Sequence, residues 1–261
     1  MLYRITALLA LGTSASAACT RDSLHAATES LLAAFQAGTS TSIAALSVDA
    51  IYTENEKAGS ITAGIFSKSL KIDHSRSSLD TTQCATYTEV IVTDKTHPYV
   101  IGTQMRFDSA GEKITKIETI VTDKGDWLFN AEGTLKYAKA EQSPTDLWGP
   151  IPEAKRDTRA VIQAAADAYL DLFNDKSIQV PWGTPCARLE GGSYTGSGKP
   201  TDSCNVGVPS GVKIGNRRYV IDETVGAVDV FCTFATSADT HEFRVDGGKL
   251  RFVHTMTNTG K

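Results

Sequence analysis

The chain has 261 residues, of which 21% are charged, and its formal net charge at pH 7 is −4. Its 26 basic and 30 acidic residues are scattered, without a basic block. This pattern argues against nucleic acid or an anionic membrane as a partner. The length suits one large domain or two small ones.

Residues 1–17 have the pattern of a secretion signal. Arg4 is followed by an apolar run over 5–11, and the sequence Ala-Ser-Ala at 15–17 fits a small-residue cleavage site. The apolar run is far shorter than the ~20 residues that a membrane-spanning helix needs. We therefore expect a secreted protein, and removing 17 of the 261 residues leaves 244.

Secretion changes the interpretation of the five cysteines, because disulfides persist in oxidising compartments. Cys186 and Cys204 flank a glycine-rich segment and are predicted to form a bridge. Cys19 could pair with Cys84, whereas Cys232 lies inside the apolar run VDVFCTF and is expected to be a buried free thiol. Spacing alone does not fix this connectivity.

An internal repeat organises the chain. Three blocks recur in the same order at offsets of 136 to 138 residues: 26–35 over 164–173, 51–55 over 187–191, and 111–122 over 247–257. The repeat predicts a duplicated domain, with a first half at 18–140 and a second half at 158–261. The segment 141–157 holds three prolines without periodicity and is the predicted linker.

Each half has the same predicted order of elements. An apolar-periodic helix comes first, with Asp22 and Asp157 as candidate N-caps. A strand with a pair of polar side chains follows, and then long strands rich in Val, Ile, Thr and Tyr. This order predicts an α+β fold with two tandem domains, each with helices packed on one face of a curved antiparallel sheet.

The element order, together with the hairpins GEK (111–113) and GGK (247–249) before the last strands, resembles the nuclear-transport-factor-2-like fold, also called SnoaL-like. The resemblance implies cone-shaped domains, each with an apolar pocket open at one end. Relatives of this fold include ketosteroid isomerase, scytalone dehydratase and limonene epoxide hydrolase. A tandem pair behind a secretion signal resembles a group of fungal secreted proteins.

Two pairs of polar side chains occupy equivalent places in the repeat. Tyr52 and Glu54 in the first half, and Arg188 and Glu190 in the second, stand two residues apart and share a strand face. If that face points into a pocket, the carboxylate can move a proton and Arg188 can hold an anion. The alternatives are a solvated face or a structural ion pair beside the predicted disulfide. Because the predicted bridge occurs only in the second half, we favour that half for the site.

The last strand of each half offers a further ionisable group. His254 stands among Leu250, Phe252 and Met256 on one predicted face, which is the setting of a pocket acid or base. Its repeat partner is Glu118. The alternative for His254 is a hydrogen-bonded core residue.

Tyr219 and Asp222 are weaker candidates for the second pocket, and a charge cluster at a strand end is the alternative. The five histidines lack the HxH and HExxH spacings of zinc sites. A G-x-S-x-G elbow, a phosphate loop and a dinucleotide fingerprint are also missing from the sequence. We therefore expect no metal and no cofactor.

Two functions are compatible with these residues. The first is a secreted, cofactor-free lyase or isomerase that acts on a small polyketide-, terpenoid- or sugar-derived substrate, with Glu190 or His254 moving the proton and Arg188 stabilising an oxyanion. The second is a non-catalytic protein that binds a small molecule, or a secreted effector. An enzyme predicts several ionisable groups that converge in one apolar pocket. A homodimer is possible in either case.

Overall fold

The structure is a computed structural model that describes residues 19–139 and 148–260. The predicted signal peptide lies outside the described residues, as do residue 140 and the first seven residues of the predicted linker, 141–147.

The first half begins with a helix and continues with six strands. The elements are α1 (Arg21–Ala37), β1 (Leu46–Glu54), β2 (Lys57–Ala58), the 3₁₀ turn η2 (Gly64–Ser67), β3 (His74–Asp80), β4 (Ala85–Val92), β5 (Tyr99–Phe107) and β6 (Ile114–Thr122). Helix α2 (Ala131–Ala138) follows the sheet.

The second half repeats this order. Its elements are α3 (Arg159–Asp171), β7 (Trp182–Glu190), β8 (Ser193–Tyr194), β9 (Ile214–Asp222), β10 (Ala227–Phe234), β11 (Ser237–Asp246) and β12 (Lys249–Asn258). The α+β prediction with two domains is confirmed.

The two sheets have the same topology. Their strand orders are β2-β1-β6-β5-β4-β3 and β8-β7-β12-β11-β10-β9. All pairings are antiparallel except β1 with β6 and β7 with β12, which are parallel. Tyr52 pairs with Ile117, and Arg188 pairs with Val253, each shifted by the same 136 residues. The register thus reproduces the sequence repeat.

Local sequence explains where the helices begin. The Thr20 side chain accepts a hydrogen bond from the Ser23 backbone at the start of α1, and Thr158 does the same for Val161 at the start of α3. The N-caps are therefore these threonines and not the predicted aspartates. Gly38 ends α1 with φ of 68°, a conformation that glycine adopts without steric cost.

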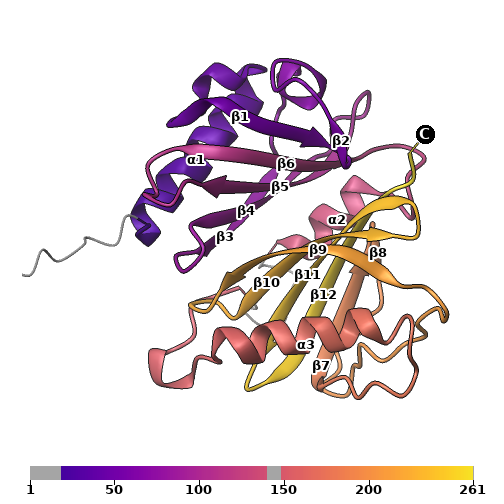
Figure 1. The fold of residues 1–261 in the computed structure, drawn as a ribbon. Coiled ribbons are helices and arrows are strands. Elements are labelled where there is room, and N and C mark those ends of the chain that lie inside the picture. The colour runs from indigo at the N-terminus through magenta and orange to yellow at the C-terminus, as the bar shows by residue number, and fades with distance from the viewer. Residues whose placement is uncertain (1–18, 140–147, 261) are drawn as a thin grey trace, which may run out of the picture.

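The main elements form four layers, helix, sheet, sheet and helix, and α2 lies between the two sheets (Figure 1). Helix α1 packs on one face of the first sheet, and α3 packs on one face of the second. The other faces of the two sheets meet, and we call this contact the seam. Its apolar centre includes Tyr87 and Ile120 from the first half and Phe231 and Met256 from the second.

The seam is tied by reciprocal ion pairs. Arg159 at the start of α3 binds the Asp80 carboxylate through Nη1 and Nη2, each at 2.7 Å. Arg21 at the start of α1 binds Asp222 through Nη1 at 2.6 Å. Each carboxylate also accepts a backbone N–H across the seam, Asp80 from Ile221 and Asp222 from Leu79, both at 2.9 Å. The same contact is therefore made twice, once in each direction.

Both predicted disulfides are present, Cys19–Cys84 and Cys186–Cys204, and Cys232 is a buried free cysteine. Among the described residues, every helix is too short or too polar to cross a membrane.

Candidate functional site

The second half contains a cavity of about 440 Å³ on the α3 side of its sheet. This volume is within the range of pockets that hold drug-sized ligands. The lining residues are Trp127, Phe173, Arg188, Glu190, Gly207, Pro209, Phe234, Ser237, Asp239, His241, Thr255, Thr257 and Thr259. Four ionisable side chains thus converge in one partly apolar space.

Arg188 and Glu190 share the cavity face of β7, as strand alternation predicts. They form an ion pair with each other. The Arg188 Nη1 also donates to the carbonyl oxygens of Val206 at 3.0 Å and Gly207 at 3.1 Å. Arg188 is 5% exposed, so its charge acts in a low-dielectric environment.

A second polar group faces the cavity from β10 and β11. Cys232 pairs with Asp239 across the two strands, and His241 stands two residues after Asp239 on the same face. The His241 Nδ1 lies 3.0 Å from the Asp239 Oδ2, and the Cys232 Sγ lies 3.5 Å from the same oxygen. The Asp239 Oδ1 accepts from the Thr257 hydroxyl at 2.6 Å.

These contacts assign the hydrogens. Burial, together with the Asp239 carboxylate, raises the pKa of the Cys232 thiol well above its ordinary value, so the thiol donates to Asp239. Asp239 thus accepts from the thiol and from the Thr257 hydroxyl, and the His241 Nδ1 lies 3.0 Å from its Oδ2. A proton on Nδ1 would face this carboxylate, and in that tautomer Nε2 is the proton acceptor of the imidazole. Within the described part of the chain no side chain or backbone group is hydrogen-bonded to Nε2, and His241 lines the cavity.

Aromatic rings hold His241 in place. Its ring stacks on Phe243 with centroids 6.0 Å apart and contacts Tyr169 at 5.7 Å and Phe173 at 6.1 Å. Burial raises the pKa of the Tyr169 phenol to about 12, so this ring stays neutral beside the site. The imidazole is thus oriented by one carboxylate and three rings.

Two clusters have the composition of metal ligands. Cys232, Asp239 and His241 offer one donor atom each within 4.8 Å of one another and could hold an ion. In this structure hydrogen bonds join the same three donors. The second cluster consists of Glu89, Glu242 and His254 and lies at the seam. There the Nη1 and Nη2 of Arg76 each bind a Glu242 carboxylate oxygen at 2.6 Å. A cation therefore already occupies that second position.

The equivalent face of the first half is filled with side chains. The Tyr52 hydroxyl donates to the Glu54 carboxylate at 2.6 Å, and the Ile65 backbone N–H donates to the same oxygen at 2.9 Å. Burial, with the hydrogen bond and the charge of Glu54, raises the pKa of Tyr52 well above its ordinary value. Phe66 packs against the Tyr52 ring and stacks on Phe35. Turn η2 thus fills the position that corresponds to the cavity.

Glu118 and His254 lie on the opposite face from the cavity, at the seam. Glu118 binds Arg218 of the second half at 2.9 Å and Lys116 at 2.9 Å. The His254 Nδ1 lies 2.6 Å from a Glu89 carboxylate oxygen of the first half, and His254 is 2% exposed. The structure therefore does not bring His254 together with Arg188, or Glu118 together with Tyr52.

Tyr219 and Asp222 also lie apart from the cavity. The Tyr219 hydroxyl donates to Asp167 of α3 at 2.6 Å, and burial with this bond raises its pKa well above the ordinary value. Asp222 is one of the two seam carboxylates. Tyr219 thus binds helix α3, and Asp222 belongs to the seam.

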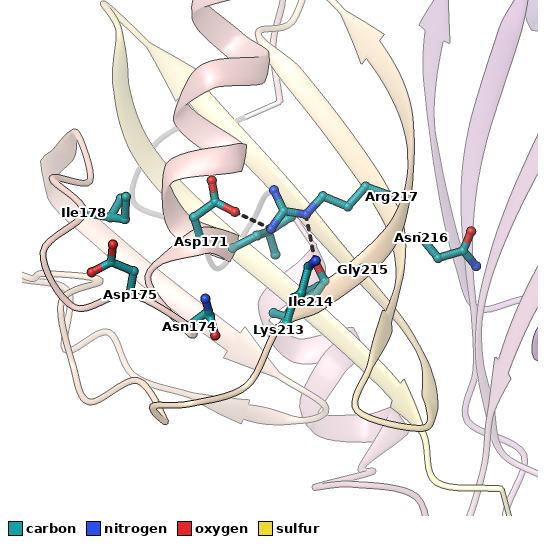
Figure 2. A pocket seen from close by; sticks show the side chains of 10 residues that line it. Asp171, Asn174, Asp175, Ile178, Lys213, Ile214, Gly215, Asn216 and Arg217 are labelled. Atoms are coloured by element: carbon teal, nitrogen blue, oxygen red, sulfur yellow. Dashed lines mark hydrogen bonds and ion pairs between the residues drawn. The ribbon is translucent and has the colours of Figure 1, made fainter.

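A larger cleft, of about 490 Å³, lies between the end of α3 and the start of β9. Figure 2 shows its Arg217 directed toward Asp171, 2.6 Å away, and toward the Ile214 carbonyl, 3.1 Å away. Asn216 points away from the cleft, and its amide donates to Glu56 of the first half at 3.0 Å. Because Arg217 and Asn216 already have hydrogen-bond partners within the protein, the smaller cavity is the better candidate site.

Sequence reasoning missed His241, Asp239 and Trp127. The signal for the first two was the alternation Asp239-Thr240-His241 in a strand, opposite Cys232 in the neighbouring strand. Trp127 lies in the connection between β6 and α2, and nothing in its local sequence indicates a contact with the other half.

Comparison with known proteins adds one match. Residues 155–257 match a domain of unknown function (DUF8021). The matched segment includes α3 and nearly all of β12, and it contains every cavity-lining residue except Trp127 and Thr259. Among curated proteins, none matches the chain.

Proposed function

We propose that the protein is a secreted lyase or isomerase that moves a proton on a small carbonyl compound in the cavity of the second half. The observation that carries this proposal is the His241–Asp239 pair, which faces the cavity with Nε2 as a proton acceptor. Arg188 supplies positive charge in the same cavity. A buried cation of this kind can stabilise an oxyanion.

The proposed chemistry needs only these groups. The His241 Nε2 removes a proton from the carbon next to a carbonyl group, and the electron pair moves onto the carbonyl oxygen. Arg188 stabilises the negative charge, while Asp239 stabilises the imidazolium. In an isomerisation the imidazolium returns the proton to another carbon. In an elimination it gives the proton to a hydroxyl group on the next carbon, which leaves as water.

Other features support the proposal. Two disulfides and the amino-terminal pattern at 1–17 fit a secreted protein. The resemblance to the SnoaL-like fold implies acid–base chemistry without a cofactor in a pocket beside the sheet. Glu190, which with His254 was one of the two groups proposed from the sequence to move the proton, here forms an ion pair with Arg188 and positions it.

Exchange of carbon-bound hydrogen with solvent tests the proposal without knowledge of the natural substrate. The protein is incubated in D₂O with a panel of β-hydroxy ketones, including a bicyclic hydroxydecalone, and NMR follows loss of the α-proton signal and formation of the enone. We expect the wild type to accelerate exchange and His241→Gln to abolish the acceleration.

The matched control is His254→Gln, which changes a buried histidine at the seam and should keep the exchange activity. Ligand binding without any exchange would contradict the enzyme proposal and favour a carrier. Equal exchange by the wild type and His241→Gln would also contradict it.

A further inference from the structure

Trp127 belongs to the first half of the chain but lines the cavity of the second. It lies between β6 and α2, and 42% of its surface is exposed. Large apolar side chains with this much exposure are few among the described residues: Val48, Ile51, Trp127, Leu128, Val161 and Val206. Of these, Trp127 is the one that borders the cavity. A ligand that covered it would bury a large flat apolar surface.

The segment that bears Trp127 is fixed to the second half by hydrogen bonds. The Asp126 carboxylate accepts from the Thr259 backbone at 2.8 Å and from the Asn258 amide at 3.2 Å. The Gly192 backbone donates to the Leu128 carbonyl oxygen at 2.9 Å. The residues before and after Trp127 are therefore both anchored, which fixes the Trp127 backbone beside the cavity.

The pair Gly191-Gly192 permits this approach. A Cβ atom on Gly191 would lie 2.5 Å from the Leu128 carbonyl oxygen, and one on Gly192 would lie 2.3 Å from the Asn130 carbonyl oxygen. Both distances are shorter than van der Waals contact. The glycines that directly follow Glu190 thus allow the first half to contact the second beside the site.

The backbone next to Trp127 is strained. Leu128 has φ of 49°, in the left-handed region that a leucine adopts only at a cost. Its side chain is 48% exposed, so burial of the leucine does not offset this cost. Strain of this kind is concentrated at functional sites, where the surrounding structure maintains it. Here the strained residue is the one that directly follows Trp127.

The remaining walls define the ligand's chemistry. Phe173, Phe234 and Pro209 are apolar, whereas β12 contributes the hydroxyls of Thr255 and Thr257. The fixed charges are one cation, Arg188, against two carboxylates, Glu190 and Asp239. A carboxylate ligand would add a third negative charge to a buried space, which is unfavourable.

We propose that the two halves form one composite binding site, in which Trp127 stacks on an uncharged cyclic ligand whose hydroxyl or carbonyl oxygens face Arg188 and His241. A ring suits a flat indole face better than an open chain, because a rigid ligand loses less conformational freedom on binding. This inference rests on the proposed function for its reacting groups and adds the ligand class and the residue that selects it.

Fluorine NMR of protein labelled with fluorotryptophan tests the composite site. The chain has three tryptophans, so Trp148 and Trp182 serve as internal references. The probes are a neutral hydroxydecalone, an open-chain β-hydroxy ketone with the same number of carbons, and a decalin carboxylate. We expect the hydroxydecalone to shift the Trp127 signal most and to bind about tenfold more weakly to Trp127→Ala, the scale of a lost aromatic contact. Trp127→Phe should restore most of the affinity.

Leu128→Ala is the control, because it alters the same segment outside the cavity and should leave probe affinity unchanged. The proposal is overturned if the hydroxydecalone does not shift the Trp127 signal, or if the carboxylate or the open chain binds as tightly as the neutral ring. A shifted Trp127 signal without α-proton exchange would support the composite site and contradict the enzyme proposal. Exchange that depends on His241, without a shift of the Trp127 signal, would do the reverse.

Discussion

The two halves share one topology but differ in what lies beneath the sheet. In the first half the connection from β2 to β3 places Ile65 and Phe66 under the sheet, where they are 2% and 0% exposed. In the second half the corresponding connection is tied by Cys186–Cys204 and contributes Gly207 and Pro209 to a cavity wall. One connection fills the fold and the other leaves it hollow. A duplicated scaffold can therefore keep its sheet and change its function through a single loop.

The largest expected effect comes from removing a buried aromatic side chain in the first half. Phe66→Ala should lower the free energy of unfolding by about 3–5 kcal/mol, because it removes a fully buried ring. Phe234→Ala in the second half should cost only about 1–2 kcal/mol, because this ring is half-buried beside an existing cavity. Urea unfolding of both variants measures the difference. Equal costs would contradict the contrast between a filled and a hollow half.

A second prediction concerns the seam that both halves share. Burial raises the pKa of Glu89, but His254 and Arg76 more than offset this and lower it to about 2, from an ordinary value of 4.5. Because the folded-state pKa is the lower one, the contribution of Glu89 is complete above about pH 4.5 and is lost as the pH falls toward 2. The loss amounts to about 3 kcal/mol.

Urea unfolding at a series of pH values checks this. The stability of Glu89→Gln should fall less steeply between pH 4.5 and 2 than that of the wild type. Glu29→Gln, on the exposed surface of α1, should follow the wild-type curve. Parallel curves for the wild type and Glu89→Gln would show that Glu89 does not link stability to pH.

A third prediction separates a positioning role from a purely structural one at the hollow half. Glu190→Gln removes the carboxylate partner of the buried Arg188, and the expected loss is about 2 kcal/mol, because the Val206 and Gly207 carbonyls still accept from the guanidinium. We also expect slower α-proton exchange with its pH profile displaced, because Arg188 is no longer held. A loss of about 4 kcal/mol or more with unchanged exchange would make the pair structural only.

The smallest effect concerns the segment that joins the halves. Leu128→Gly replaces a leucine at positive φ with the residue that adopts this conformation freely, so we expect a gain of about 0.5 kcal/mol in stability. Thermal unfolding measures it. A loss of about 1 kcal/mol or more would mean that the Leu128 side chain itself stabilises the segment.

The repeat was readable from the sequence because two-residue and helical periodicities survive duplication. The offset of 136 residues between Tyr52 and Arg188 recurs in the register of both sheets, and strand alternation correctly placed Arg188 and Glu190 on one face. Both disulfides were also anticipated from the positions of the cysteines. The repeat and the strand faces depend on spacing along the chain, which one sequence contains, whereas the cysteine pairing also required the inference of secretion.

The sequence did not allow us to predict which residues pack against the two faces of β12. Its apolar residues Phe252 and Met256 suggested a pocket lining around His254, but Met256 packs in the seam and Phe252 packs against Trp148. Both faces of the strand are buried, so alternation could not tell the seam from the cavity. His241 was missed for a related reason, because its link to Cys232 depends on the pairing of β10 with β11.

The reciprocal contacts of Asp80 and Asp222 have a consequence for how the halves could diverge. Each half presents to its neighbour the same kind of arginine and carboxylate that it receives, as identical subunits do in a two-fold dimer. Because the seam is self-complementary, its residues are the ones that hold the two halves together. The two outer, helix-covered faces are then free to change independently of each other. One copy can therefore become a solid support while its twin remains open to a ligand.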